Sequence, residues 1–284
     1  MHDTRNAFNI SSMKKVLAFL FIACCPMATV VSYAQDDDFG LDFSLNAEKK
    51  IRKGVDFSLE GGVRTQDNTR KIDRWTVGAA LDVKLYNSTT FDLKAGAKWE
   101  YLWVNNLSTT KDKYTTIYTE EGYADVLDGY NKKASYWRNR HRSSLSLTAS
   151  YSPNKRWDFS LKEILQYTHF CKASTTIDKY RLDDDDAMSL EKTSAKDYSP
   201  KDRFILRSRF TTQYNIKSCP LDPYASVEYG CGLHYTANKW KYTAGTDIKL
   251  NKQHKFTLFY RYQTEDDDDE PNGHLLGMGY QLKF

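Results

Sequence analysis

From Phe39 onward, apolar residues occupy alternate positions in segments of about ten residues, and the spacing of an amphipathic helix is nowhere sustained. In 91–103, aromatic and aliphatic residues alternate with residues that are mostly charged or small. This alternation is typical of a β-strand with one apolar and one polar face. The sequence predicts about eleven strands, in the ranges 39–49, 55–64, 74–85, 91–103, 137–151, 157–167, 203–216, 223–235, 240–250, 255–265 and 274–284.

The connections alternate between short turns and long polar segments. YNSTT, SPNKR and LNKQH are short, whereas 105–134 and 173–200 are long and are interpreted as loops. Bacterial outer-membrane barrels have short periplasmic turns and longer extracellular loops, with aromatic girdles at both lipid–water boundaries. Aromatic residues near the predicted strand ends fit such girdles. They are Trp75, Trp99, Tyr101, Trp103, Trp137, Trp157 and Trp240.

These features favour an all-β fold, a transmembrane antiparallel β-barrel of about 10 to 12 strands. The alternative is a soluble periplasmic β-sandwich that binds a ligand, whose core would be mainly aliphatic. Bacterial barrels normally have an even number of strands. An eleventh segment means either that one segment is wrongly divided or that 39–49 joins the wall irregularly. Glu163 interrupts the apolar face of 157–167, which predicts a β-bulge there.

The first 34 residues have the features of a targeting segment. A basic pair precedes the apolar stretch VLAFLFIACCPMATVV, and SYA at 32–34 offers a site with two small residues for cleavage. We interpret 1–34 as an over-extended start plus a cleaved signal peptide, with translation starting at Met13, and 35–284 as the barrel. A lipoprotein site at Cys24 is the alternative. No later run of 18 apolar residues predicts a transmembrane helix.

Three cysteines follow the predicted signal peptide: Cys171, Cys219 and Cys231. They are too few and too irregularly spaced for a disulfide framework or a structural zinc site. Small buried or lipid-facing side chains are the simpler interpretation, and a bridge between Cys219 and Cys231 stays open.

The chain ends in GMGYQLKF, with apolar residues at alternate positions and a terminal aromatic residue. This ending resembles the C-terminal signature of outer-membrane barrels that the barrel-assembly machinery recognises. We therefore expect Tyr280, Leu282 and Phe284 to form the insertion signal.

Near the predicted mature start, FGLDFSLNAEKKI, GVDFSLEGGVRTQDN and DRWTVGAALDVKL are similar to the beginning of a Gram-negative family of outer-membrane barrels. It is known as domain of unknown function 2490 and is found mostly in Bacteroidetes. The resemblance extends over the mature chain. It implies the barrel fold and an outer-membrane location, and it implies no catalytic residues.

The 41 basic and 37 acidic residues nearly balance, so no nucleic-acid partner is expected. If the apolar faces contact lipid, the polar faces line a lumen with both charges and a basic excess. Guanidinium groups suit carboxylate or phosphate. The sequence thus predicts a salt-bridged structural barrel, or a narrow channel or binding barrel for a small anionic solute. The basic cluster comprises Arg138, Arg140, Arg142, Arg203, Arg207 and Arg209.

An outer-membrane lipid-modifying enzyme of the acyl hydrolase type is the remaining alternative, with His141, Ser143 and His169 as candidates. No hydrolase motif accompanies them, so a non-enzymatic barrel without catalytic residues is predicted. The acid runs 182–188 and 264–273 are interpreted as solvated loop tips, with Ca²⁺ or lipopolysaccharide bridging as the alternative. No cofactor or metal is predicted, and the expected partners are outer-membrane lipid, lipopolysaccharide and the barrel-assembly machinery.

Overall fold

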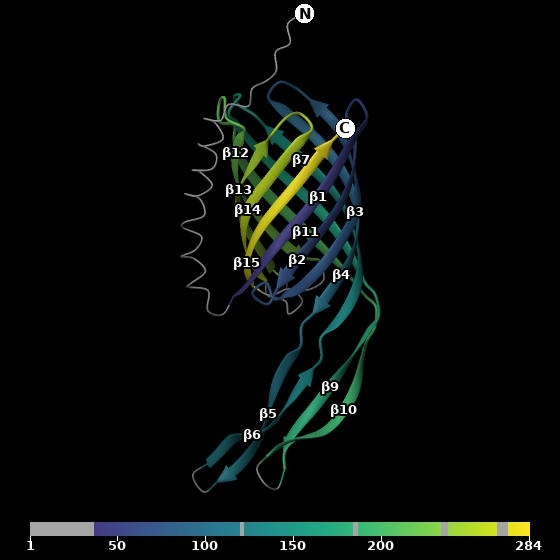
Figure 1. Ribbon diagram of the computed structural model, residues 1–284, viewed down its shortest axis with the longest axis vertical. Helices are drawn as coiled ribbons and strands as arrows, with labels where there is room; N and C mark the ends of the chain where they lie inside the picture. Colours follow the sequence, from purple (N-terminus) through teal and green to yellow (C-terminus); the bar gives the residue numbers. More distant parts are fainter. Residues whose placement is uncertain (1–36, 120–121, 184–186, 234–237, 266–271) are drawn as a thin grey trace, which may run out of the picture.

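The computed structural model describes residues 37–119, 122–183, 187–233, 238–265 and 272–284. Within them, eleven strands close into a barrel and four form a second sheet that projects from one end (Figure 1). These residues contain no helix long and apolar enough to cross a membrane. The barrel strands are β1 (Asp38–Arg52), β2 (Val55–Gln66), β3 (Lys71–Asn87), β4 (Phe91–Asn106), β7 (Tyr136–Tyr151), β8 (Trp157–Phe170), β11 (Lys201–Tyr214), β12 (Leu221–Gly232), β13 (Asn238–Lys249), β14 (His254–Glu265) and β15 (Gly273–Lys283).

The eleven barrel strands match the predicted segments, and the structure is an all-β barrel of the outer-membrane type. The predicted signal peptide and the Cys24 alternative lie outside the described residues, as do residues 184–186 and 266–271 of the acid runs.

The odd strand number is accommodated where the barrel closes. Neighbouring strands in the wall are antiparallel except β1 and β15, which pair in parallel from Asp38 opposite Gly273 to Glu48 opposite Lys283. In an antiparallel wall with an odd number of strands, the first and last strands run in the same direction, so their pair must be parallel. The irregular entry expected for 39–49 is therefore this parallel seam.

The expectation that 105–134 and 173–200 are loops is wrong. Strands β5 (Thr109–Thr119) and β6 (Gly122–Lys133) form one hairpin, and β9 (Ala173–Leu182) and β10 (Met188–Tyr198) form another. Pairing of β6 with β9 joins them into one sheet, where the rings of Tyr130 and Tyr180 stack 4.7 Å apart. Both faces of this sheet carry polar residues, so no apolar alternation marks its strands in the sequence.

The bulge predicted at Glu163 is also wrong. Strand β8 pairs with β7 and with β11 without a shift in register, and Glu163 lies opposite Leu147 on one side and Ser208 on the other. Strict alternation therefore places the Glu163 side chain on the outer wall, between Leu161 and Leu165. The strand is therefore regular in its backbone, and what is unusual is a glutamate at a position that faces outward.

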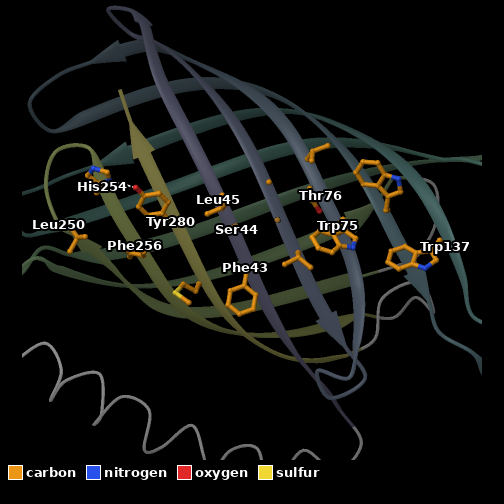
Figure 2. Close-up of a pocket in the computed structure, with 16 residues that line it drawn as sticks. Phe43, Ser44, Leu45, Trp75, Thr76, Trp137, Leu250, His254, Phe256 and Tyr280 are labelled. Atoms are coloured by element: carbon orange, nitrogen blue, oxygen red, sulfur yellow. Dashed lines mark hydrogen bonds between the residues drawn. The ribbon is translucent and has the colours of Figure 1, made fainter.

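Aromatic and aliphatic side chains cover the outer wall. All six tryptophans lie there and are 37–47% exposed. Tyr101 packs edge-on against Trp103, with ring centroids 4.4 Å apart. This wall has a hollow of about 1450 Å³. Figure 2 shows Phe43, Leu45 and Trp75 among its lining side chains. The predicted girdle residues thus all lie on the surface available to lipid.

Candidate functional site

The barrel encloses a polar chamber of about 510 Å³, lined by the inward-facing residues of its strands. Alternation along each strand directs every second side chain into this space. Eight lining side chains are basic and five are acidic, so the ionisable lining has an excess of three positive charges. The basic ones are Arg64, Lys98, Arg142, Lys162, Arg207, Arg209, Lys241 and Arg261, and the acidic ones are Glu48, Glu60, Asp82, Glu100 and Glu228.

Glu228 of β12 is the centre of the densest ion-pair cluster and is only 4% exposed. Arg207 donates to both carboxylate oxygens, from Nε at 2.9 Å and from a terminal nitrogen at 3.1 Å. Arg209 donates from Nε at 2.6 Å, and Lys241 Nζ lies 3.9 Å away. A fork of this kind is a strong, charge-assisted arrangement that holds the guanidinium in place. Arg207 also donates to Gln166 Oε1 at 2.6 Å, which links β11 to β8 across the chamber wall.

A second group of ion pairs crosses the wall formed by β2, β4 and β7. The ammonium of Lys98 contacts Glu60 and lies 3.1 Å from Glu100. Arg142 lies 3.8 Å from Glu100. In the wall, β7 is next to β4, and β3 lies between β4 and β2. The pair of Arg142 with Glu100 therefore joins neighbouring strands, and the pair of Lys98 with Glu60 joins strands on either side of β3.

Lys162 of β8 differs from the other basic groups in this lining. Its ammonium forms no hydrogen bond or ion pair with another residue in the described part of the chain. Arg209, Lys98 and Arg207 repel it, and Asp82 attracts it without a direct ion pair. The excess positive charge of the chamber therefore includes a cation with no direct anionic partner.

The interior narrows toward the end that carries the projecting sheet. Phe170, the last residue of β8, points inward and is 2% exposed. Its ring is covered by cations, with Arg140 at 4.6 Å, Lys201 at 5.0 Å and Arg203 at 5.3 Å from the ring centroid. Here the interior is reduced to a cavity of about 80 Å³, lined in part by Phe170. Cation–π contacts hold this basic layer around an apolar centre.

The structure brings five of the six predicted arginines to the interior: Arg140, Arg142, Arg203, Arg207 and Arg209 line one or both of the cavities. Arg138 lines neither cavity but packs over the Phe170 ring, 5.3 Å from its centroid, and its guanidinium donates to the backbone oxygens of Cys171 and Ser199, each at 2.8 Å. These two oxygens flank the β9–β10 hairpin, so Arg138 fixes both ends of the hairpin to the barrel.

The predicted insertion signal lies in and just after β15. Tyr280 is on the outer wall, and its hydroxyl is 2.6 Å from Nδ1 of His254 (Figure 2). The backbone N–H of Phe284 donates to the backbone oxygen of Glu48 at 2.9 Å, which extends the parallel pairing of β15 with β1. The described cysteines are free thiols, so Cys219 and Cys231 do not form a bridge.

The residues considered for lipid hydrolysis lie on the outer wall near the projecting sheet. Nδ1 of His169 is 2.7 Å from a carboxylate oxygen of Asp202, and Tyr167 donates to the same oxygen at 2.8 Å. The rings of His141 and His169 are 6.5 Å apart. Within the described residues, however, the hydroxyl of Ser143 forms no hydrogen bond with either histidine. A histidine with its orienting carboxylate is present there, but not a serine paired with it.

Sequence reasoning did not identify two residues that matter for the interior, the cation Lys162, unpaired within the described residues, and the buried ring of Phe170. Lys162 is not among the predicted lumen residues, although unbroken alternation from Trp157 places it on the inward face. Phe170 lies beyond the predicted end of its strand and was not considered. Its ring is covered by Arg140 of β7 and by Lys201 and Arg203 of β11, the two strands that flank β8, and the sequence carries no local signal for these contacts.

Residues 39–274 match the model of a family described as "Protein of unknown function (DUF2490)". No curated protein matches the chain. Among solved structures, the β domain of the Bordetella autotransporter BrkA is similar, with 13% sequence identity and a TM-score of 0.43. That match covers 83% of this chain and 86% of the Bordetella chain.

Proposed function

This chain belongs to the DUF2490 family of proteins of unknown function, and we propose that it is an outer-membrane barrel that binds a small anionic solute in its interior chamber. The outer wall supports the location. Aromatic side chains near both ends of the strands and aliphatic side chains between them suit the two boundaries and the centre of a bilayer.

The observation that carries the proposed binding is the unpartnered ammonium of Lys162 within a positively charged chamber. A half-buried ammonium without a directly bound counter-ion costs free energy, and repulsion from Arg209, Lys98 and Arg207 adds to that cost, while attraction by Asp82 offsets part of it. An anionic solute in the chamber would remove both costs, and the neighbouring guanidiniums would donate to its oxygens. Carboxylate and phosphate are the groups that match these donors.

The dimensions of the interior favour a binding chamber over a wide pore. About 510 Å³ is the volume of a small-molecule site, and the basic layer around Phe170 narrows the interior beyond it. Porins, which leave a wide aqueous channel, have 16–18 strands, and barrels of about eight are filled by side chains or hold one small ligand, whereas this one has eleven. Any passage of solute would be narrow and would involve movement of this layer.

We predict that replacing Lys162 by Gln weakens phosphate binding at least about tenfold, because one charge-assisted contact in a desolvated site contributes about 1.5–3 kcal/mol. The measurement is calorimetric titration of the refolded barrel in detergent with inorganic phosphate. Thermal unfolding gives a second readout, because a ligand that binds the folded state raises the unfolding temperature.

Lys113 on β5 is the matched control, since Lys113→Gln makes the same change on the projecting sheet, away from the chamber. Phosphate affinity should be unchanged in that variant. Absence of phosphate binding to the unmodified protein, or equal affinity in the Lys162 and Lys113 variants, would contradict the proposal. Sedimentation of the protein with the outer membrane, together with migration on gels that changes on heating, tests the location separately.

A further inference from the structure

Glu163 is the only carboxylate that faces outward between the two girdles in the described barrel strands. On β8 it lies between Trp157 near one end and Tyr167 near the other. Ten residues at about 3.3 Å each and a tilt of about 40° span roughly 25 Å, the height of the apolar band of such barrels. Glu163 is four residues from Tyr167, or about 13 Å along the strand, farther than a glutamate side chain extends. Its carboxyl group therefore lies within the apolar band, out of reach of the polar boundary.

The surroundings of Glu163 are apolar apart from one hydroxyl. Ser208 on β11 donates to Glu163 Oε2 at 2.6 Å, and this is the single hydrogen bond of the carboxylate within the described residues. The neighbouring outward side chains on β7, β8 and β11 are 42–51% exposed. They are Leu147, Leu161, Leu165, Leu206 and Phe210. In hydrocarbon, a carboxyl group with an unmet hydrogen-bonding oxygen is costly, and an ionisable residue at this depth indicates a contact site.

We propose that Glu163 and Ser208 form the polar centre of an interface with a second copy of this chain, through the outer wall of β7, β8 and β11. In a symmetric dimer, a twofold axis brings the same patch of both copies together, so the patch must be complementary to itself. Two carboxyl groups meet this condition, because with one proton between them they hydrogen-bond to each other. Each Ser208 hydroxyl continues to donate to its own Glu163.

Hydrogen bonds between two barrels contribute strongly to their association when the contact lies within the bilayer. Apolar side chains gain little by leaving lipid for another apolar wall, so association within a bilayer depends on packing and on hydrogen bonds between the partners. The leucines around Glu163 supply the packing surface, and the paired carboxyl groups supply the hydrogen bond and fix the register of the two copies. The inference is independent of the chamber, because Glu163 faces away from it.

The test is energy transfer between donor- and acceptor-labelled copies of the full-length protein in phosphatidylcholine vesicles, over a range of protein-to-lipid ratios. We expect the unmodified protein to dimerise and Glu163→Leu to weaken dimerisation about tenfold, the effect of one hydrogen bond at the upper end of those measured in membranes. Thr246→Val, which removes an outward hydroxyl from β13, is the matched control and should dimerise normally. A monomeric unmodified protein, or unchanged association of the Glu163 variant, would overturn the proposal.

A second measurement uses only the unmodified protein, so it stands even if Glu163→Leu does not fold. Dicyclohexylcarbodiimide is an apolar reagent that modifies carboxyl groups, and it reaches them from the lipid. We expect mass spectrometry to show modification of Glu163 at low protein-to-lipid ratio and protection at high ratio, where dimers form. Equal modification at all ratios would contradict burial in a dimer, and protection at every ratio would indicate a bound lipid or another protein.

Discussion

Replacing Glu228 by Gln is expected to lower the free energy of unfolding by about 3–5 kcal/mol, the usual effect of removing one partner from a buried ion pair. The carboxylate is 4% exposed and interacts with Arg207, Arg209 and Lys241. Without its negative charge, three cations remain close together in a desolvated space. Urea unfolding of the refolded barrel, followed by tryptophan fluorescence, measures the loss.

Glu48→Gln is the control for this change. Glu48 pairs with Lys283 at 3.0 Å near the end of the wall, and its side chain is 23% exposed. Removing its charge should cost about 0–1 kcal/mol, as for ion pairs near the surface. If both variants lose similar stability, the ion pairs of Glu228 do not stabilise the barrel more than an ion pair near the surface does.

The Glu228→Gln variant also links the stability of the barrel to anion binding. Sulfate should stabilise Glu228→Gln more than it stabilises the unmodified protein, because the three released cations form an additional anion site. Equal stabilisation of both proteins by sulfate would show that these cations are compensated in another way.

Replacing Phe170 by Ala is expected to raise the ion conductance of the barrel severalfold. The ring occupies the centre of the narrow layer, and four cations pack over it. Its removal enlarges the small cavity next to the main chamber and leaves Arg140 and Arg203 to line a wider, basic opening. Recording in planar bilayers with unequal KCl concentrations on the two sides should show both the higher conductance and a preference for chloride.

The truncation should also destabilise the barrel by about 3–5 kcal/mol, as for other buried phenylalanines, so folding is checked first by the shift in gel migration on heating. Phe210→Ala is the matched control, because Phe210 is 51% exposed on the outer wall. Its conductance should equal that of the unmodified protein. Unchanged conductance in a folded Phe170 variant would show that the layer around Phe170 does not limit passage.

Strand positions could be predicted because each barrel strand has water-facing polar residues on one side and lipid-facing apolar residues on the other. Segments such as 91–103 carry this pattern without reference to the rest of the chain. The projecting strands β5, β6, β9 and β10 could not be predicted in this way. The pairing of β6 with β9, which joins their two hairpins, forms between segments about 50 residues apart, such as Gly129 and Arg181, and the faces of these strands carry no contrast in polarity.

The candidate site was only partly accessible to sequence reasoning. Alternation is enough to place Arg207, Arg209 and Glu228 on inward faces, and the excess of basic residues follows from the same assignment. Alternation does not show which cation has a carboxylate partner, because this depends on the lateral order of the strands and on the register that sets Arg209 opposite Glu228.

The sequence by itself determined the all-β class, the eleven wall segments and the face on which each residue lies, since these depend on a period of two along the chain. Only the tertiary structure decided the parallel seam between β1 and β15, the partners of Glu228, the lack of a partner for Lys162 and the burial of Phe170. All four depend on which residues of other strands lie beside them, whether those strands are consecutive in the chain, as β11, β12 and β13 are, or distant in it, as β1 and β15 are. Such contacts are fixed when the sheet closes on itself, and local polarity does not encode them.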